Sequence, residues 1–279
     1  MDSNFANIRG EKKMIKADVH VHSDFSADTE IEMESHIKTA IKLGFESLCI
    51  TDHYDMGYPN DAEIFDIEIY FKKIQELKEK YHNKIELLCG IELGLMPHLK
   101  EKISAIISKY NFDFIIGSSH LIDIDHDSCL KSFYEKRSEK EAYTEYFKSI
   151  LQNVKTFSEY DVYGHLDYTV RYGPNKNKFF DFNDYKEIFE ELLKIIIENN
   201  KGIEINTAGL RNGLGYPHPH KDILKMYKSL GGKIITVGSD AHVTEYLGHE
   251  FKVAEDLMKE IGFNCYAVYK NRVPSFYKF

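Results

Sequence analysis

The chain contains 279 residues, of which 43% are hydrophobic and 29% are charged, so it can bury a large core beneath a charged surface. Its 45 acidic and 36 basic residues give a formal net charge of -9, which argues against general affinity for nucleic acid or anionic membranes. The length suits either one α/β barrel, since such barrels commonly contain about 250 residues, or two small domains.

The cysteines and the N-terminus indicate the compartment. The four cysteines are widely spaced and form no CxxC pair, which is typical of reduced thiols. The N-terminal residues lack the apolar stretch of a signal peptide, and no segment approaches the roughly 20 apolar residues that span a bilayer. We therefore expect a cytoplasmic protein.

Short apolar runs alternate with longer amphipathic segments along the chain. The runs stop at Gly, Ser, Asp or His, as strands do. They cover residues 16–21, 47–52, 84–92, 112–118, 161–165, 201–206 and 233–239, with a weaker run at 265–270. Helical spacing covers residues 32–43, 67–81, 99–110, 139–157, 185–199 and 249–261.

Strands that alternate with helices in this number predict a parallel sheet covered by helices. We expect a distorted, TIM-like β/α barrel of about seven parallel strands that forms a single domain over residues 1–279. A doubly wound open sheet is the alternative.

Histidine and carboxylate side chains follow these strands where each apolar run gives way to polar residues. In chain order they are His20, His22, Asp28, His53, Glu92, His120, His165, Asp240 and His242. In a barrel, such positions meet at the carboxyl-terminal rim. A single strand-end histidine is more often a hydrogen-bonded structural residue, but nine nitrogen and oxygen ligands at one rim predict several metal ions.

The ordered segments HVHSDFSAD, TDHYD, GIELG, GSSHLID, GHLDY, EINTAGLR and GSDAH resemble those of the polymerase and histidinol phosphatase (PHP) superfamily. This resemblance implies a barrel with three divalent ions at its rim, and His and carboxylate ligands suit Zn, Fe or Mn. It assigns one ion to His20, His22, Glu92 and Asp240, and a second to Asp28, His53 and His242. It also implies that Glu92 bridges to a third ion, held with His120 and His165.

Such a metal site suits the hydrolysis of a phosphate ester, because metal ions bind phosphoryl oxygens, lower the pKa of a bridging water and offset charge on the leaving oxygen. We expect a metal-bridging hydroxide as the nucleophile. The CxxxxxR loop of tyrosine phosphatases and a P-loop are absent from the sequence, which disfavours a covalent phosphoenzyme and nucleotide-driven transfer.

Two arginines are candidates for the phosphate group. Arg171 and Arg211 both follow strand-end segments, and a guanidinium can bind phosphate through two hydrogen bonds. A solvated surface position is the alternative for each of them.

Further polar residues in the rim loops are candidates for the substrate. We expect Ser119 and His218 to contact the phosphate ester, and Asp167 or His242 to protonate the leaving alkoxide. An ordinary structural role is the alternative for Asp167 and His218.

Within the superfamily, the chain looks most like the stand-alone histidinol-phosphate phosphatases, because its length leaves no room for a polymerase and EINTAGLR and GHLDYTVRY resemble their segments. The resemblance implies hydrolysis of L-histidinol phosphate to L-histidinol and phosphate in histidine biosynthesis. One alternative is another PHP phosphoesterase that acts on nucleotides or phosphotyrosine. Others are a non-catalytic metal-binding PHP module and a metal-dependent amidohydrolase.

Overall fold

The computed structural model describes residues 8–9, 15–58, 64–123 and 126–279. The strands are β1 (Ile8–Arg9), β2 (Ala17–Asp18), β3 (Ser47–Ile50), β4 (His53–Tyr54), β5 (Glu86–Gly94), β6 (Phe114–Ser118), β7 (Leu121–Asp123), β8 (His126–Asp127), β9 (Val162–Tyr163), β10 (Gly202–Asn206), β11 (Ile235–Gly238), β12 (Cys265–Lys270) and β13 (Val273–Lys278). The helices are α1 (Met33–Leu43), α2 (Ile67–Tyr81), α3 (Lys100–Lys109), α4 (Glu139–Thr156), α5 (Lys186–Glu198), α6 (Ala208–Arg211), α7 (Lys221–Ser229) and α8 (Phe251–Ile261).

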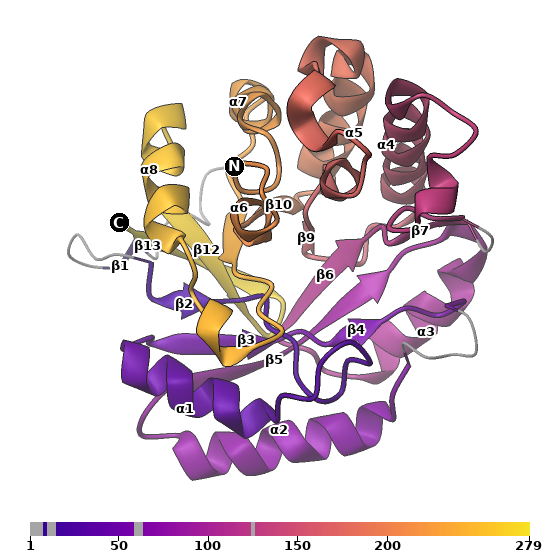
Figure 1. The fold of residues 1–279 in the computed structure, drawn as a ribbon. Coiled ribbons are helices and arrows are strands. Elements are labelled where there is room, and N and C mark those ends of the chain that lie inside the picture. Colours follow the sequence, from indigo (N-terminus) through magenta and orange to yellow (C-terminus); the bar gives the residue numbers. More distant parts are fainter. Residues whose placement is uncertain (1–7, 10–14, 59–63, 124–125) are drawn as a thin grey trace.

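Seven parallel strands form a nearly closed barrel with helices around it (Figure 1), in the order β11-β10-β9-β6-β5-β3-β2. β4 pairs with one end of β5, also in parallel. The first and last strands meet beyond their ends, where the Asp240 N–H donates to the His20 carbonyl at 2.8 Å and the His22 N–H donates to the Ala241 carbonyl at 3.0 Å. The predicted barrel is confirmed, and the open-sheet alternative is wrong.

The run predicted at 265–270 is a strand, but it lies outside the barrel. It is β12, which pairs antiparallel with β13. Asn271 and Arg272 connect the two strands, and both have positive φ angles, 50° and 65°, as a tight two-residue hairpin requires. The parallel pairing of two strands needs a long crossover connection, so the two-residue turn makes β13 antiparallel to β12.

This hairpin covers the amino-terminal end of the barrel. The Asn271 N–H donates to Asp113 Oδ1 at 3.1 Å, and Arg272 Nε donates to Asp161 Oδ2 at 2.6 Å. Both acids precede barrel strands, β6 and β9. The carboxyl-terminal end of the barrel is therefore the end that remains for a functional site.

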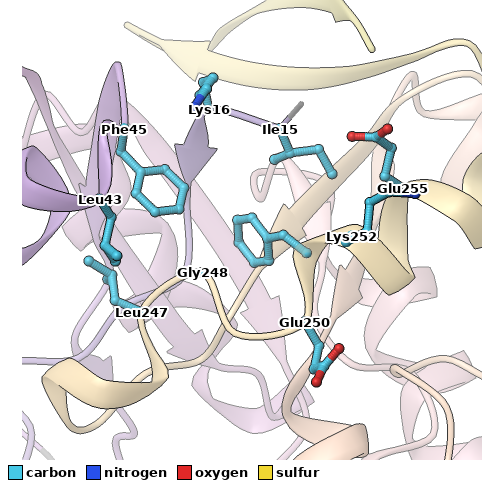
Figure 2. Close-up of a pocket in the computed structure, with 10 residues that line it drawn as sticks. Ile15, Lys16, Leu43, Phe45, Leu247, Gly248, Glu250, Lys252 and Glu255 are labelled. Carbon is cyan, nitrogen blue, oxygen red and sulfur yellow. The ribbon is translucent and has the colours of Figure 1, made fainter. Parts of the chain in front are cut away.

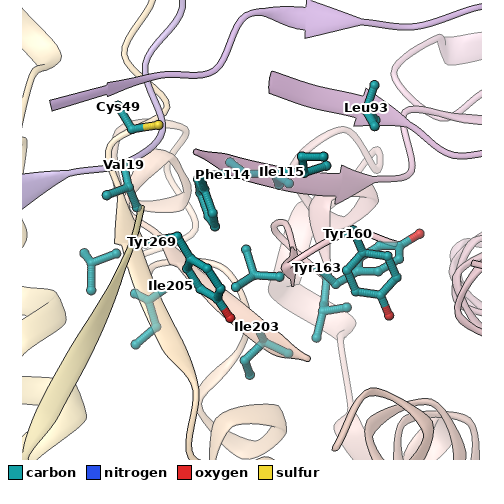
Figure 3. Close-up of a cluster of buried hydrophobic side chains, with 14 of the residues drawn as sticks. Val19, Cys49, Leu93, Phe114, Ile115, Tyr160, Tyr163, Ile203, Ile205 and Tyr269 are labelled. Atoms are coloured by element: carbon teal, nitrogen blue, oxygen red, sulfur yellow. The ribbon is translucent and has the colours of Figure 1, made fainter. Parts of the chain in front are cut away.

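Buried side chains from the barrel strands and the hairpin form one core (Figure 3). The Tyr269 ring from β12 stacks on Phe114 from β6, with ring centroids 5.2 Å apart. Helices add their apolar faces: α5 buries Phe189, Leu192 and Ile196, which share one side of a helix. Burying such a side chain contributes roughly 1.5–3 kcal/mol. Within the described ranges, no helix has both the length and the apolar character that a membrane span needs.

Candidate metal centre

The nine predicted metal ligands all lie at the carboxyl-terminal end of the barrel. The seam between the first and last strands explains part of this convergence. His20 and Asp240 are 220 positions apart in the sequence, yet the hydrogen bonds across the seam hold their backbones together. His22 and His242 lie on the same side as these two residues, since the His22 ring contacts both Asp240 and His242.

Glu92 lies at the centre of the cluster and is fully buried. Its Oε2 atom is 2.8 Å from His53 Nδ1 and 3.2 Å from His20 Nε2. Its Oε1 atom is 2.9 Å from His165 Nε2 and 3.4 Å from His120 Nε2. The two carboxylate oxygens thus face different imidazoles, an arrangement suited to a carboxylate that bridges two cations.

The electrostatics of the cluster favour positive charge beside Glu92. Burial alone would raise the pKa of Glu92, but the charges of His20, His120 and His53 hold it well below its usual range. Burial opposes a charge on His20, yet Glu204 and Glu92 raise the pKa of its ring well above the ordinary value. The buried carboxylates therefore stabilise cationic partners, whether protons or divalent ions carry the charge.

A second set of groups lies nearer the surface. His242 Nε2 is 2.8 Å from Asp28 Oδ2, and His53 Nε2 is 3.7 Å from the same oxygen. His22 Nε2 is 3.2 Å from Asp240 Oδ1, and the His22 ring stacks on His242 at 4.2 Å. With one ring nitrogen toward Glu92 and the other toward Asp28, His53 lies between two of the predicted ligand sets.

The donor atoms fit a group of divalent ions. Three triplets have their ligand atoms within 4.8 Å of one another: His20, His22 and Glu92; His22, His53 and His242; and His53, Glu92 and His120. Among the described residues, His20 Nε2, His22 Nε2 and Glu92 Oε2 are buried without a hydrogen-bond partner. His20 Nε2 and His22 Nε2 lie 3.2 and 3.6 Å from Glu92 Oε2 without forming hydrogen bonds, and a bound cation between them would interact with all three atoms. Nitrogen and oxygen donors of this kind suit Zn, Fe and Mn.

Two of the imidazoles contact buried carboxylates through Nδ1, the ring nitrogen that does not face Glu92. His20 Nδ1 is 2.6 Å from Glu204 Oε1, and His120 Nδ1 is 2.5 Å from Asp55 Oδ2. Both interactions leave Nε2 directed toward Glu92. Glu204 and Asp55 were not predicted as functional residues, although EINTAGLR and TDHYD contain them.

A pocket of about 280 Å³ opens over the cluster. It is lined by Asp28, His53, His120, His165, Tyr168, Arg171, Tyr172, Arg211, Asn212, Asp240, His242, Val243 and Tyr246. Both predicted phosphate-binding arginines thus line the same pocket as six of the predicted ligands. The tyrosines that line this pocket were not predicted as site residues, although GHLDYTVRY contains two of them.

Two guanidinium nitrogens of Arg171 have no hydrogen-bond partner among the described residues. Its guanidinium lies over the Tyr168 ring, 4.1 Å from the centroid, and its Nη1 atom is 3.7 Å from Asp240 Oδ2. The ring orients the guanidinium by a cation–π contact. Within the described part of the chain, Nε and Nη1 are buried without a hydrogen-bond partner. An anionic ligand in the pocket would satisfy these donors.

Arg211 uses its guanidinium nitrogens for hydrogen bonds within the protein. Its Nη1 and Nη2 atoms donate to the carbonyl oxygens of Ser239 and Asp240. The guanidinium also lies 5.0 Å from the centre of the Tyr246 ring. Arg211 therefore fixes the end of the last barrel strand as well as lining the pocket.

The structure does not bring Ser119, Asp167 and His218 to the pocket. All three are buried. Ser119 Oγ is hydrogen-bonded to the Tyr163 hydroxyl at 2.6 Å. Asp167 Oδ1 is 2.5 Å from His218 Nδ1, and its Oδ2 accepts from the His220 N–H at 2.9 Å. The contacts of Asp167 and His218 match the structural alternative given for them, and Ser119, predicted to contact the substrate, is occupied by Tyr163 instead.

A second pocket, of about 380 Å³, lies outside the barrel between the end of α1 and the start of α8 (Figure 2). Its lining includes Leu43, Phe45 and Phe251 together with the charged residues Lys16 and Glu250. No metal-ligating triplet found in the described ranges belongs to this pocket. The candidate metal ligands found among the described residues therefore lie at the rim and not in this pocket.

Fold and site together define a metal-binding β/α barrel. The chain belongs to the PHP domain family, which matches residues 18–208. The resemblance recognised in the sequence is confirmed.

Relatives with assigned names cover nearly the whole chain. The histidinol-phosphatase of Lactococcus lactis subsp. lactis is 36% identical over 258 residues, which are 92% of this chain and 95% of that protein. A probable histidinol-phosphatase of Clostridium acetobutylicum is 34% identical and covers 85% of this chain and 90% of its own length.

Solved structures show the same fold. The crystal structure of histidinol phosphate phosphatase from Lactococcus lactis, complexed with Zn, L-histidinol and phosphate, matches with a TM-score of 0.87 and 33% identity. The match covers 94% of this chain and 99% of that one. A putative histidinol phosphatase of Listeria monocytogenes matches 85% of this chain and 99% of its own, with a TM-score of 0.73. At 20% identity, it supports the fold alone.

Proposed function

We propose that the protein is a metal-dependent phosphomonoesterase that hydrolyses L-histidinol phosphate to L-histidinol and phosphate, a reaction of histidine biosynthesis. Support comes from the Lactococcus lactis phosphatase, which matches nearly the full chain and was solved with Zn, L-histidinol and phosphate. In this chain, the pocket at the carboxyl-terminal end of the barrel combines buried metal-ligand atoms with two arginines.

The proposed cofactors are three divalent ions, chosen from Zn, Fe and Mn. Glu92 is proposed to contact more than one ion, because its two oxygens face different histidines. His20, His22 and Asp240 would complete one set, and His120 and His165 another. The third set comprises Asp28, His53 and His242. When bound, such ions lower the pKa of water and offset charge on phosphoryl oxygens.

The arginines give this chain its affinity for the phosphate group. Arg171 has free donors in the pocket and is proposed to bind a phosphoryl oxygen directly. Arg211, at the end of α6 after the neighbouring strand β10, adds positive charge to the pocket. Asp167 is buried away from the pocket, and His242 is proposed as a metal ligand whose Nδ1 lies 2.9 Å from the Asp240 carbonyl, so neither residue is carried forward as the acid for the leaving alkoxide. A hydroxide nucleophile and a cytoplasmic location stay predictions from the sequence.

The pocket disfavours two alternatives. A non-catalytic metal-binding module has no need of a guanidinium with unused donors above the cluster. An amidohydrolase would not need two arginines in the pocket. Other phosphate esters are the remaining competitors.

Turnover of a panel of phosphate esters separates these substrates. The protein, loaded with zinc or manganese, is assayed for phosphate release from L-histidinol phosphate, phosphotyrosine and AMP. We expect kcat/KM to be highest for L-histidinol phosphate by at least about 100-fold, which corresponds to about 2.7 kcal/mol of discrimination. Preference for phosphotyrosine or AMP would overturn the assigned substrate, and no turnover of any ester would overturn the enzyme assignment.

A further inference from the structure

Glu204 is a fully buried acid beside the metal centre that the proposed reaction does not use. It lies on β10, and its side chain contacts three separate segments. Its Oε1 atom is 2.6 Å from His20 Nδ1. Its Oε2 atom accepts from the His165 N–H at 3.2 Å and from Asn206 Nδ2 at 3.1 Å. One carboxylate thus connects the first strand, the loop after β9 and its own strand.

A glycine leaves room for this carboxylate. A Cβ atom on Gly238 would lie 2.5 Å from Glu204 Oε1 and 2.3 Å from His20 Cβ, which is closer than side chains can approach. The neighbouring strand therefore lacks a side chain at the point where Glu204 meets His20.

We propose that Glu204 is a positioning residue for metal binding, acting through His20 and His165. By accepting the Nδ1 proton of His20, it fixes the tautomer in which the Nε2 lone pair faces Glu92. The negative charge behind the ring also makes Nε2 a better donor to a cation. Its contact with the His165 backbone sets the distance between the two imidazoles. The inference rests on the proposed metal site and adds a residue to it.

The substitution Glu204→Gln tests this role. Glutamine keeps the size of the side chain but offers one oxygen to three donors, and it carries no charge. Zinc affinity is measured by competition with a chromophoric chelator, and zinc per chain is measured after dialysis. We expect at least one ion to bind about 10–100-fold more weakly than in the parent protein. Zinc affinity within about threefold of the parent value would overturn the proposal.

Asp161 supplies a matched control. It is also buried, and its Oδ2 accepts from the Ile115 N–H at 2.9 Å, but it lies at the opposite end of the barrel. Asp161→Asn is expected to lower the thermal midpoint of the metal-free protein and leave zinc affinity unchanged. Equal losses of zinc affinity in Asp161→Asn and Glu204→Gln would show a general effect on the fold and overturn the positioning role.

A measurement on the parent protein covers the case in which Glu204→Gln does not fold. In the zinc-loaded protein, nitrogen NMR of the histidine rings reports which nitrogen carries the proton. The proposal requires a proton on Nδ1 of His20 and zinc on Nε2, with the signal assigned by its loss in His20→Ala. Zinc on Nδ1 of His20 would overturn it.

These readouts are independent of the substrate. If the parent protein binds zinc but does not hydrolyse L-histidinol phosphate, the proposed function fails and the role of Glu204 is still decided by zinc affinity. If the parent protein binds no zinc, both the metal site and the inference fail.

Discussion

Arg171 and Arg211 differ in the number of donors that each can offer a ligand. Two nitrogens of Arg171 are buried without a partner in the described structure, whereas Arg211 donates to two carbonyl groups of the last strand end. Arg171 should therefore contribute more to phosphate affinity, and Arg211 more to the shape of the site.

We predict that Arg171→Ala lowers kcat/KM for the phosphate ester. The loss of transition-state stabilisation should be roughly 2–3 kcal/mol, which is the usual energy of hydrogen bonds to a charged group. It should also raise the inhibition constant of inorganic phosphate more than Arg211→Ala does. Arg137, which pairs with Glu145 at 2.5 Å away from the pocket, provides the control. An unchanged inhibition constant in Arg171→Ala would remove this residue from the phosphate site.

Asp18 gives the stability of the protein a dependence on pH. Its carboxylate accepts from the Ser239 N–H at 3.0 Å and the Gly248 N–H at 2.9 Å. Burial nevertheless raises its pKa from 3.8 to about 6. Because the folded state holds this proton more tightly than the unfolded chain, its contribution to stability is complete below pH 3.8 and is lost as the pH rises through about 6.

We predict that Asp18→Asn removes this dependence. Relative to the parent, the free energy of unfolding of the variant should increase by roughly 2–3 kcal/mol between pH 4 and 7, as a shift of about two units implies. Urea unfolding of both metal-free proteins at several pH values measures the difference. A difference that stays constant with pH would contradict the assigned pKa.

At the scale of elements, hydrophobic patterning was sufficient to predict the barrel strands, because each apolar run ends at a polar residue. It did not predict that β12 would lie outside the barrel, because β12 is an apolar run that follows a helix as the barrel strands do, and its pairing with β13 leaves no local pattern in the sequence. The short helix α7 was missed as well. Its buried residues Ile223, Leu224 and Tyr227 give too few repeats for a helical period to stand out.

The hairpin β12–β13 should matter for stability and not for catalysis. Arg272 pairs with the buried Asp161 at 2.6 Å, so Arg272→Ala leaves a buried acid without its cation. We predict a loss of roughly 3 kcal/mol in the free energy of unfolding with kcat/KM unchanged.

Lys270 on the same hairpin supplies the control for this prediction. It pairs with Glu86 at 2.7 Å, and the two side chains are 61% and 42% exposed. Such surface pairs contribute about 0–1 kcal/mol, so Lys270→Ala should cost much less than Arg272→Ala. If urea unfolding showed that both variants lose the same free energy of unfolding, the role given to the buried Arg272–Asp161 pair would be contradicted.

For the whole molecule, spacing and family resemblance were enough to name the residues that converge at the rim, but not to orient every side chain. Ser119 and His120 are adjacent, yet His120 Nε2 faces Glu92 while Ser119 Oγ bonds to Tyr163. Asp167 has its oxygens occupied by His218 and His220. These outcomes depend on packing between loops that are distant in the sequence, which no local pattern records.

The same limit explains why Glu204 and Asp55 were not predicted. Each acts on a histidine from another segment of the chain, at His20 and His120. Such pairs become visible only once the barrel has closed.

Anomalous diffraction from crystals of the zinc-loaded protein would test most directly whether the barrel rim binds a cluster of cations. We predict zinc peaks between Glu92 and the surrounding imidazoles of His20, His53 and His120, with Arg171 above them. Zinc peaks confined to other surfaces, with none beside Glu92, would contradict the metal centre and the phosphatase activity proposed for it.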